Sequence, residues 1–340
     1  MKLGNRHEAT GNSKKAGLVG MLACTVLFAL WMSAEGQQTG KIPRIGILPP
    51  GAISERVHLW EAFRQALREL GYVEGKNITL IFPSGKVTPE RLSDLAAELV
   101  NLKVDVIVAP TTAGVLEVMK ATNAIPIVMP TSIDPIGAGL VASLAHPGRN
   151  ATGLTSIAPD LSGKRLELIK EIVPRVSQIA VLSNPTSPTV PSQMKETKLA
   201  AQSLGLRLQT LEVRAPNDFE RVFHAATTGH ASAFVALDDV FVFTHRIEIV
   251  KLVAKTRLPA MYGFSEFVEA GGLMSYAANL SDSYRRSATY VDKILKGAKP
   301  ADLPIEQPKK FELIINLKAA KQIGLTIPPS VLARADRVIK

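Results

Sequence analysis

Small polar residues follow several strand-like runs of the sequence at the point where each run ends. Examples are Pro110-Thr111-Thr112, Ser183-Asn184-Pro185 and Asp238-Asp239, and a longer polar turn spans residues 130–134. In an open parallel sheet, ligands bind beyond the carboxyl ends of the strands, where helix N-termini present free N–H groups. Such groups hold an anion without a cationic side chain, and a nearby aspartate can meet an ammonium group. The pattern predicts a site for a zwitterion or a carboxylate.

The candidate ligand-binding residues come from these turns and from aromatic side chains that could cover an apolar part of the ligand. Hydroxyl and amide groups are candidates for the anion, and Asp134 or Asp238 for the ammonium group. Each residue singly is also typical of a helix cap or a turn. Their coincidence at corresponding strand ends in both halves of the chain indicates a site. The full candidate set is Ser54, Thr111, Thr112, Thr131, Ser132, Asp134, Asn184, Asp238, Phe264 and Tyr276.

Signatures of catalysis are degraded in this chain. A Gly-x-Ser-x-Gly turn is approached only at residues 263–267, where Phe267 replaces the second glycine. The six histidines lack His-x-x-x-His spacing, and no Gly-x-x-x-x-Gly-Lys-Ser/Thr motif occurs. We therefore predict no catalytic residue, no metal site and no cofactor, and expect that the protein is not an enzyme.

Two patterns could be mistaken for nucleotide or nucleic-acid binding. Residues 137–142 match Gly-x-Gly-x-x-Ala, but they follow the fourth strand instead of the first, and Asp160 begins a helix instead of ending a strand. Lysines and arginines are scattered over predicted helix faces with no interleaved aromatic residues. We expect neither a dinucleotide nor a nucleic acid as partner.

The elements that position these residues alternate between strands and helices. Strands are predicted at residues 44–49, 78–82, 104–109, 125–129 and 152–157, and again at 178–183, 207–213, 233–237, 258–262, 273–277 and 311–315. Helices are predicted at 54–70, 89–102, 112–122, 160–173, 189–204, 218–228, 240–256 and 281–295. Near-continuous Val/Ile runs joined by helices are typical of parallel sheets buried on both faces. Two such series predict an α/β protein with two doubly wound parallel-sheet lobes.

The N-terminal segment differs from the rest. The chain has 340 residues and a net charge of +10. A basic start is followed by an apolar run over residues 16–34 and a polar tail from Gln37, which suits a cleaved signal peptide better than a retained membrane helix. Lipidation at Cys24 is a less favoured alternative. Loss of residues 1–36 removes four basic and two acidic residues together with the single cysteine, which leaves +8 and no disulfide.

Several longer motifs form a specific set. They are Ile125-Pro126-Ile127-Val128, Asp134-Pro135-Ile136, Leu144-Ala145-His146-Pro147-Gly148-Arg149-Asn150, Thr152-Gly153-Leu154-Thr155, a block over residues 294–308, and Asn316-Leu317-Lys318-Ala319-Ala320 through Pro328. This set resembles the ABC transporter substrate-binding proteins of the group that includes tryptophan- and tyrosine-type binders. The resemblance extends from about residue 42 to residue 339.

The resemblance implies a periplasmic binding protein of the type I architecture, with three chain crossings that form a hinge. The expected domains are a signal peptide at 1–36, a first lobe at 41–155 plus 277–304, and a second lobe at 156–276 plus 305–340. It also implies a periplasmic location after cleavage near Ala34 to Gly36, and an ABC permease with a separate ATPase subunit as partners. We expect the mature form to be a soluble monomer.

The ligand is less closely defined. The resemblance favours an aromatic or branched amino acid, with another small carboxylate as the next choice. Two other classes of protein stay open. One is a ligand sensor that binds its solute and then signals to a membrane receptor. The other is an exported enzyme in which Asp134 or Asp238 is a general base.

Overall fold

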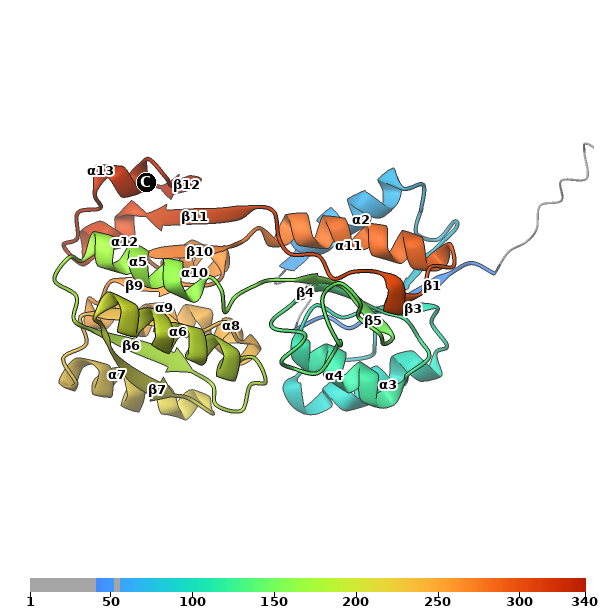
Figure 1. Ribbon diagram of the computed structural model, residues 1–340, viewed down its shortest axis with the longest axis horizontal. Coiled ribbons are helices and arrows are strands. Elements are labelled where there is room, and N and C mark those ends of the chain that lie inside the picture. The colour runs from blue at the N-terminus through green and yellow to red at the C-terminus, as the bar shows by residue number, and fades with distance from the viewer. Residues whose placement is uncertain (1–40, 52–55) are drawn as a thin grey trace, which may run out of the picture. The chain divides into compact units, whose positions relative to one another are not determined.

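The computed structural model describes residues 41–51 and 56–340. The predicted signal peptide and Ser54 therefore lie outside the described residues. Among the helices of the described part, none is both long enough and apolar enough to cross a membrane. Residues from Pro43 to the C-terminus form two α/β lobes, each built on its own sheet (Figure 1).

The first lobe contains a five-stranded parallel sheet in the order β2-β1-β3-β4-β5. Side chains that alternate along its strands enter two different cores: Val106 and Val108 pack on one face, whereas Ile107 packs on the other. This burial on both faces explains the unbroken Val/Ile runs. The strands are β1 (Arg44–Ile47), β2 (Thr79–Ile81), β3 (Val106–Val108), β4 (Ile127–Ser132) and β5 (Ala151–Thr155); the helices are α2 (Val57–Glu69), α3 (Leu92–Asn101), α4 (Thr112–Ala121) and α11 (Leu280–Leu295).

The second lobe contains a seven-stranded sheet in the order β12-β11-β10-β9-β8-β6-β7. Its strands are β6 (Gln178–Ser183), β7 (Arg207–Glu212), β8 (Ala233–Ala236), β9 (Ala260–Tyr262), β10 (Met274–Ala278), β11 (Phe311–Asn316) and β12 (Arg337–Ile339). Its helices are α5 (Ser162–Ile172), α6 (Val190–Leu204), α7 (Phe219–Thr228), α8 (Val240–Thr244), α9 (Arg246–Thr256), α10 (Ser265–Glu269), α12 (Leu317–Gln322) and α13 (Pro329–Leu332). Short 3₁₀ turns occur at Pro89–Arg91, Pro216–Asp218 and Pro300–Asp302.

The predicted class, two doubly wound α/β lobes, is confirmed, with several local differences. The short helices α10, α12 and α13 were not predicted. β10 and β11 pair antiparallel, because β11 enters the second sheet from the opposite direction after the last crossing. The helix predicted over residues 240–256 is two helices, since His245 departs from helical angles between α8 and α9. The edge strand β12, with one exposed and two half-buried residues, was not predicted.

The chain passes between the lobes three times, through residues 156–161, through Asn279, and through residues 303–310 (Figure 1). Two of these crossings lie side by side, because the Thr155 N–H donates to Glu306 O and the Glu306 N–H donates to Gly153 O. Gly153 has a φ of +131°, and a Cβ there would lie 2.2 Å from the Met129 carbonyl oxygen. The first crossing therefore starts from a position that only glycine can occupy without strain.

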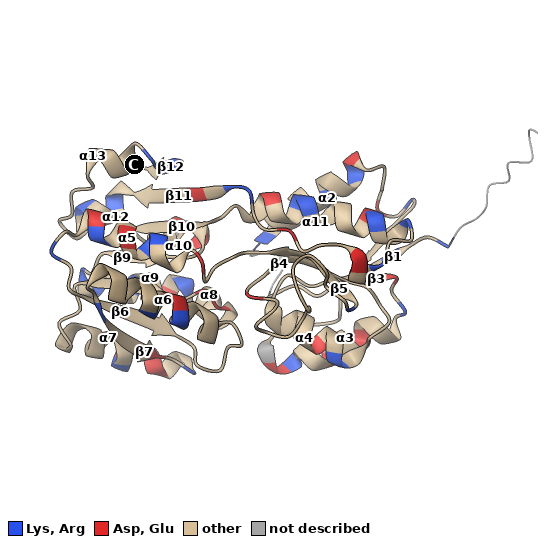
Figure 2. Cartoon of the chain, in the orientation of Figure 1, with Lys and Arg blue, Asp and Glu red and all other residues tan. Residues whose placement is uncertain are grey.

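The helix α11 returns to the first lobe and packs along α2 (Figure 1). Trp60 meets Tyr284 edge-to-face with ring centroids 5.1 Å apart, and the Tyr72 hydroxyl donates to Asp292 Oδ1 over 2.9 Å. Ala277 and Ala278, which the predicted boundaries assign to the first lobe, pair with β11 in the second sheet. Lysines and arginines are spread over both lobes with acidic residues among them (Figure 2).

Candidate functional site

A cavity of about 200 Å³ lies at the carboxyl ends of the strands of both lobes. We call it the interlobe cavity. Its lining comes from the segments that follow β1, β2, β3, β4 and β5 in the first lobe and β6, β8 and β9 in the second. The residues that line it are Pro50, Arg56, Val87, Thr88, Leu92, Pro110, Thr111, Thr112, Ala113, Thr131, Ile133 and Ser156, together with Asn184, Thr186, Ser187, Pro188, Thr189, Asp239, Val240, Phe241 and Phe264.

The first lobe presents the N-terminus of α4 to this cavity. Thr111 is the N-cap residue, and its Oγ1 accepts a hydrogen bond from the Gly114 N–H over 3.0 Å. The Thr112 hydroxyl is buried and contacts Ser132 Oγ and both backbone groups of Ile133, each at 3.0 Å. Thr112 thus ties the start of α4 to the end of β4, while the helix terminus itself lines the cavity.

The second lobe presents the start of α6 in the same way. Residues 186–189 line the cavity directly before this helix of 15 residues, and Ser187 Oγ lies 3.0 Å from Thr189 Oγ1. Asn184 shapes the turn, since its Oδ1 accepts from the Thr186 N–H and hydroxyl at 3.1 and 2.7 Å. Because the N-termini of α4 and α6 carry partial positive charge, an anionic group is stabilised where both line one cavity.

A carboxylate lies in the same lining. Asp239 is 8% exposed, and its Oδ1 accepts from the Val242 N–H at 3.0 Å as the N-cap of α8 and from Asn184 Nδ2 at 3.4 Å. One cavity therefore combines helix N-termini with a single aspartate. This combination suits a molecule that carries both a carboxylate and an ammonium group.

The neighbouring Asp238 has a different role. Its Oδ2 accepts from Arg165 Nη2 over 2.9 Å, and Arg165 Nε donates to the Tyr276 carbonyl oxygen over 2.9 Å. Burial raises the pKa of Asp238, and the Arg165 guanidinium opposes this effect. A Cβ at Gly263 would lie 1.5 Å from Asp238 Oδ1, so glycine is required there. Asp238 supports the site loop from behind and does not line the cavity.

Aromatic and apolar groups form the rest of the lining. Phe241 and Phe264 come from the second lobe, and Val87 and Leu92 from the first. The buried Arg56 extends from the first lobe over the ring of Phe243, with its guanidinium carbon 3.7 Å from the ring centroid. This cation–π contact joins the two lobes at the edge of the cavity.

The structure brings together five of the predicted site residues: Thr111, Thr112, Thr131, Asn184 and Phe264 all line the interlobe cavity. Four do not line it. Ser132 lies behind Thr112, Asp238 pairs with Arg165, Asp134 Oδ1 accepts from the Gly137 N–H within its own turn, and the Tyr276 ring stacks on Phe311 at 6.2 Å. Ser54 lies outside the described residues.

Sequence reasoning missed Arg56, Ser156, Ser187, Asp239 and Phe241, which also line the cavity. Asp239 had a usable signal, because an aspartate one residue before an apolar helical run is a preferred N-cap whose side chain lies at the helix start. Ser187 likewise precedes Pro188 at the beginning of α6. Within the described part of the chain, no cluster of three or more His, Cys, Asp or Glu side chains could hold a metal ion.

Two α/β lobes, three crossings and a cavity at the facing strand ends define the type I periplasmic binding class of solute-binding proteins. The family model of the ABC transporter substrate binding proteins matches residues 54–339, and the chain belongs to this family.

Known relatives agree with this assignment. An ABC domain from Streptococcus pneumoniae, solved in complex with L-Trp, is 28% identical with a TM-score of 0.82, over 88% of this chain and 100% of that one. A conserved domain protein from Vibrio cholerae is 30% identical with the same TM-score and coverage. A tyrosine-binding protein from Clostridioides difficile is 24% identical over 78% of this chain and 76% of its own length.

Proposed function

We propose that this protein captures an aromatic amino acid in the interlobe cavity and delivers it to a membrane permease. The observation that carries the proposal is the placement of Asp239 in the same lining as the N-termini of α4 and α6. The carboxylate of the solute would lie at the helix N-termini, and its ammonium group at Asp239. The rings of Phe241 and Phe264 would contact its side chain. Relatives that bind tryptophan and tyrosine support this ligand class.

The proposal is tested by calorimetric titration of L-tryptophan, L-tyrosine and L-leucine into wild type and Asp239→Asn. Asparagine keeps the N-cap acceptor of α8 but removes the charge that the ammonium group would meet. A charge-assisted hydrogen bond contributes roughly 1.5–3 kcal/mol, so we expect the variant to bind the preferred amino acid at least about tenfold more weakly. The matched control is Asp94→Asn, at an exposed position on α3 outside the cavity lining and outside the crossings. Equal affinity of wild type and Asp239→Asn would contradict the proposed ammonium site.

We also propose an extracytoplasmic location and transport partners for this chain. Members of the substrate-binding family act outside the cytoplasm, and the basic and apolar N-terminal segment supports export with cleavage near Ala34 to Gly36. The exported protein would then meet a permease that works with a separate ATPase subunit. The intact mass of the secreted chain tests the cleavage: an uncleaved N-terminus would contradict it.

A further inference from the structure

One charged side chain of the first lobe is buried against aromatic rings of the second. Arg56 is the N-cap residue of α2 and is 6% exposed. Its guanidinium carbon lies 3.7 Å from the centroid of the Phe243 ring and 5.7 Å from that of the Phe264 ring. Cation–π attraction acts within about 6 Å of a ring centroid. Because both rings belong to the second lobe, this contact exists only where the two lobes meet.

The contact continues into the lining of the interlobe cavity. Phe243 is buried and does not line the cavity, but its ring meets that of Phe264 edge-to-face with centroids 5.3 Å apart. Phe264 and Arg56 both line the cavity. A solute that contacts Phe264 is therefore linked to the Arg56 contact through the Phe243 ring.

The charge of Arg56 is stabilised by these rings and not by an anion. Among the described residues, no carboxylate forms an ion pair with Arg56, and its Nε has no hydrogen-bond partner. The Tyr284 hydroxyl close to it is uncharged at neutral pH, because burial raises the pKa of Tyr284 to about 12. A guanidinium suits such a position, since it is planar and more weakly hydrated than an ammonium group.

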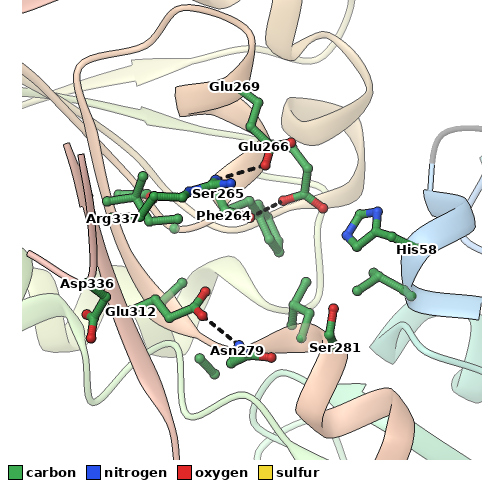
Figure 3. Close-up of a pocket in the computed structure, with 17 residues that line it drawn as sticks. His58, Phe264, Ser265, Glu266, Glu269, Asn279, Ser281, Glu312, Asp336 and Arg337 are labelled. Atoms are coloured by element: carbon green, nitrogen blue, oxygen red, sulfur yellow. Dashed lines mark hydrogen bonds and ion pairs between the residues drawn. The ribbon is translucent and has the colours of Figure 1, made fainter. Parts of the chain in front are cut away.

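A second cavity, of about 350 Å³, separates the lobes beside this contact. Phe264 and Glu266 line it from the second lobe, and His58 lines it from the start of α2 (Figure 3). His58 lies opposite Glu266, and among the described residues no hydrogen bond or ion pair joins His58 to the second lobe. Arg56, two residues before His58, is therefore free to leave the rings when the lobes open.

We propose that Arg56 is a positioning residue for solute capture: stacked on Phe243, it stabilises the closed arrangement of the lobes and slows release of the solute. The inference rests on the proposed binding of an aromatic amino acid in the interlobe cavity. In an open arrangement Arg56 is apart from the rings and in water. Closure removes this water, and a cation–π contact contributes most when it is desolvated. The contact thus forms after the solute has entered and acts on dissociation instead of association.

The test is stopped-flow fluorescence of the full chain with L-tryptophan and L-tyrosine, which gives the association and dissociation rate constants separately. We expect Arg56→Met to raise the dissociation rate constant about tenfold and to leave the association rate constant within roughly twofold. Arg56→Lys keeps the charge without the planar guanidinium, so its dissociation rate constant should lie between those of wild type and Arg56→Met.

The matched control is Arg64→Met. Arg64 also lies on α2, and its guanidinium carbon is 6.0 Å from the centroid of the Phe82 ring. Both residues belong to the first lobe, so their contact does not change when the lobes open or close. The control should leave both rate constants within roughly twofold of wild type.

A double-variant cycle identifies the contact through which Arg56 acts. Phe243→Leu removes a ring outside the cavity lining, so it should also speed dissociation. Arg56→Met/Phe243→Leu should then release the amino acid no more than about twofold faster than the faster single variant, because both substitutions remove one contact. An arginine that acted on the solute directly would give effects that multiply. Thermal melting reports whether Phe243→Leu folds, and the Arg56 variants decide the matter if it does not.

Unchanged dissociation from a folded Arg56→Met protein would overturn the inference. Slower association as the sole effect, an equal effect of Arg64→Met, or multiplied effects in the double variant would overturn it as well. Absence of binding of either amino acid to wild type would overturn the proposed function, and this inference with it. Normal binding with unchanged release would overturn the inference alone, so the two failures are distinguishable.

Discussion

At the scale of single residues, the two adjacent aspartates after β8 have different roles. Asp239 lines the interlobe cavity, while Asp238 turns inward to the buried Arg165. Arg165 also donates to the Tyr276 carbonyl oxygen, so one side chain of α5 links the site loop to β10. The side chain of Arg165 is 3% exposed and that of Asp238 is 5% exposed. Its first role is to fix the position of the loop that presents Asp239.

Removal of Arg165 should be strongly destabilising. In Arg165→Met the carboxylate of Asp238 stays buried without a cation, and loss of one partner of a buried pair costs roughly 3–5 kcal/mol. Urea denaturation measures the free energy of unfolding. The double variant Arg165→Met/Asp238→Asn should recover part of the loss, because no buried charge is left. Arg334→Met, which removes a surface partner of Glu171, serves as control and should cost about 1 kcal/mol or less. Equal losses for the two arginines would contradict this role.

The same residues show how far the sequence predicts the site. Thr111 and Asn184 were predicted because they directly follow buried strands, and strand direction alone places them at the ligand edge. Asp238 and Asp239 occupy neighbouring positions with opposite orientations, and only the packing of α5 against the loop decides which one reaches the cavity. Arg56 was missed because its position depends on Phe243 in the other lobe. Contacts of that kind leave no local pattern in the sequence.

At the scale of elements, the return of α11 to the first lobe brings together three tyrosines, of which Tyr284 and Tyr290 are buried and Tyr72 is half-buried. Burial raises the pKa of Tyr284 to about 12, with Arg56 opposing, and it also raises the pKa of Tyr290 to about 12. Burial and the hydrogen bond to Asp292 raise the pKa of Tyr72 to about 12. All strands except β12, and the longer helices, were predictable from periodicity. The place of α11 was expected only from the family resemblance, because its amphipathic pattern does not say which lobe it covers.

These tyrosines predict a loss of stability in alkali. A tyrosine ionises near pH 10 in the unfolded chain, and in the folded chain Tyr284 ionises near pH 12. The folded state therefore holds more protons between these values, and stability that is complete below about pH 10 is lost as the pH rises toward 12. Between these pH values the fully buried Tyr284 contributes a slope of up to about 1.4 kcal/mol per pH unit. Urea denaturation at a series of pH values measures the slope.

The matched variant for this prediction is Tyr284→Phe. The Tyr284 hydroxyl is buried without a hydrogen-bond partner among the described residues, so its removal should change the free energy of unfolding by less than about 0.5 kcal/mol at neutral pH. Above pH 10 the variant should lose stability less steeply than wild type. An identical pH slope in both proteins would show that Tyr284 does not carry the effect.

At the scale of the whole molecule, the three crossings are short compared with the lobes they join. Residues 156–161, Asn279 and residues 303–310 connect two lobes that each bury their own hydrophobic cores. In hinge motion, a few residues between two rigid lobes typically absorb the whole change in backbone angles. A solute that contacts Thr111 in one lobe and Asp239 in the other would favour the closed arrangement, because only that arrangement makes both sets of contacts.

Closure predicts that a saturating amino acid makes the protein more compact. Small-angle X-ray scattering should show a smaller radius of gyration with the amino acid that binds most tightly than without ligand. Asp239→Asn should need a solute concentration at least about tenfold higher for the same change, in line with its weaker affinity. Asp94→Asn should follow the wild-type curve. If calorimetry shows saturation while the scattering stays the same, the solute binds without closure, and a permease would have to recognise the bound solute itself instead of the closed form of the lobes.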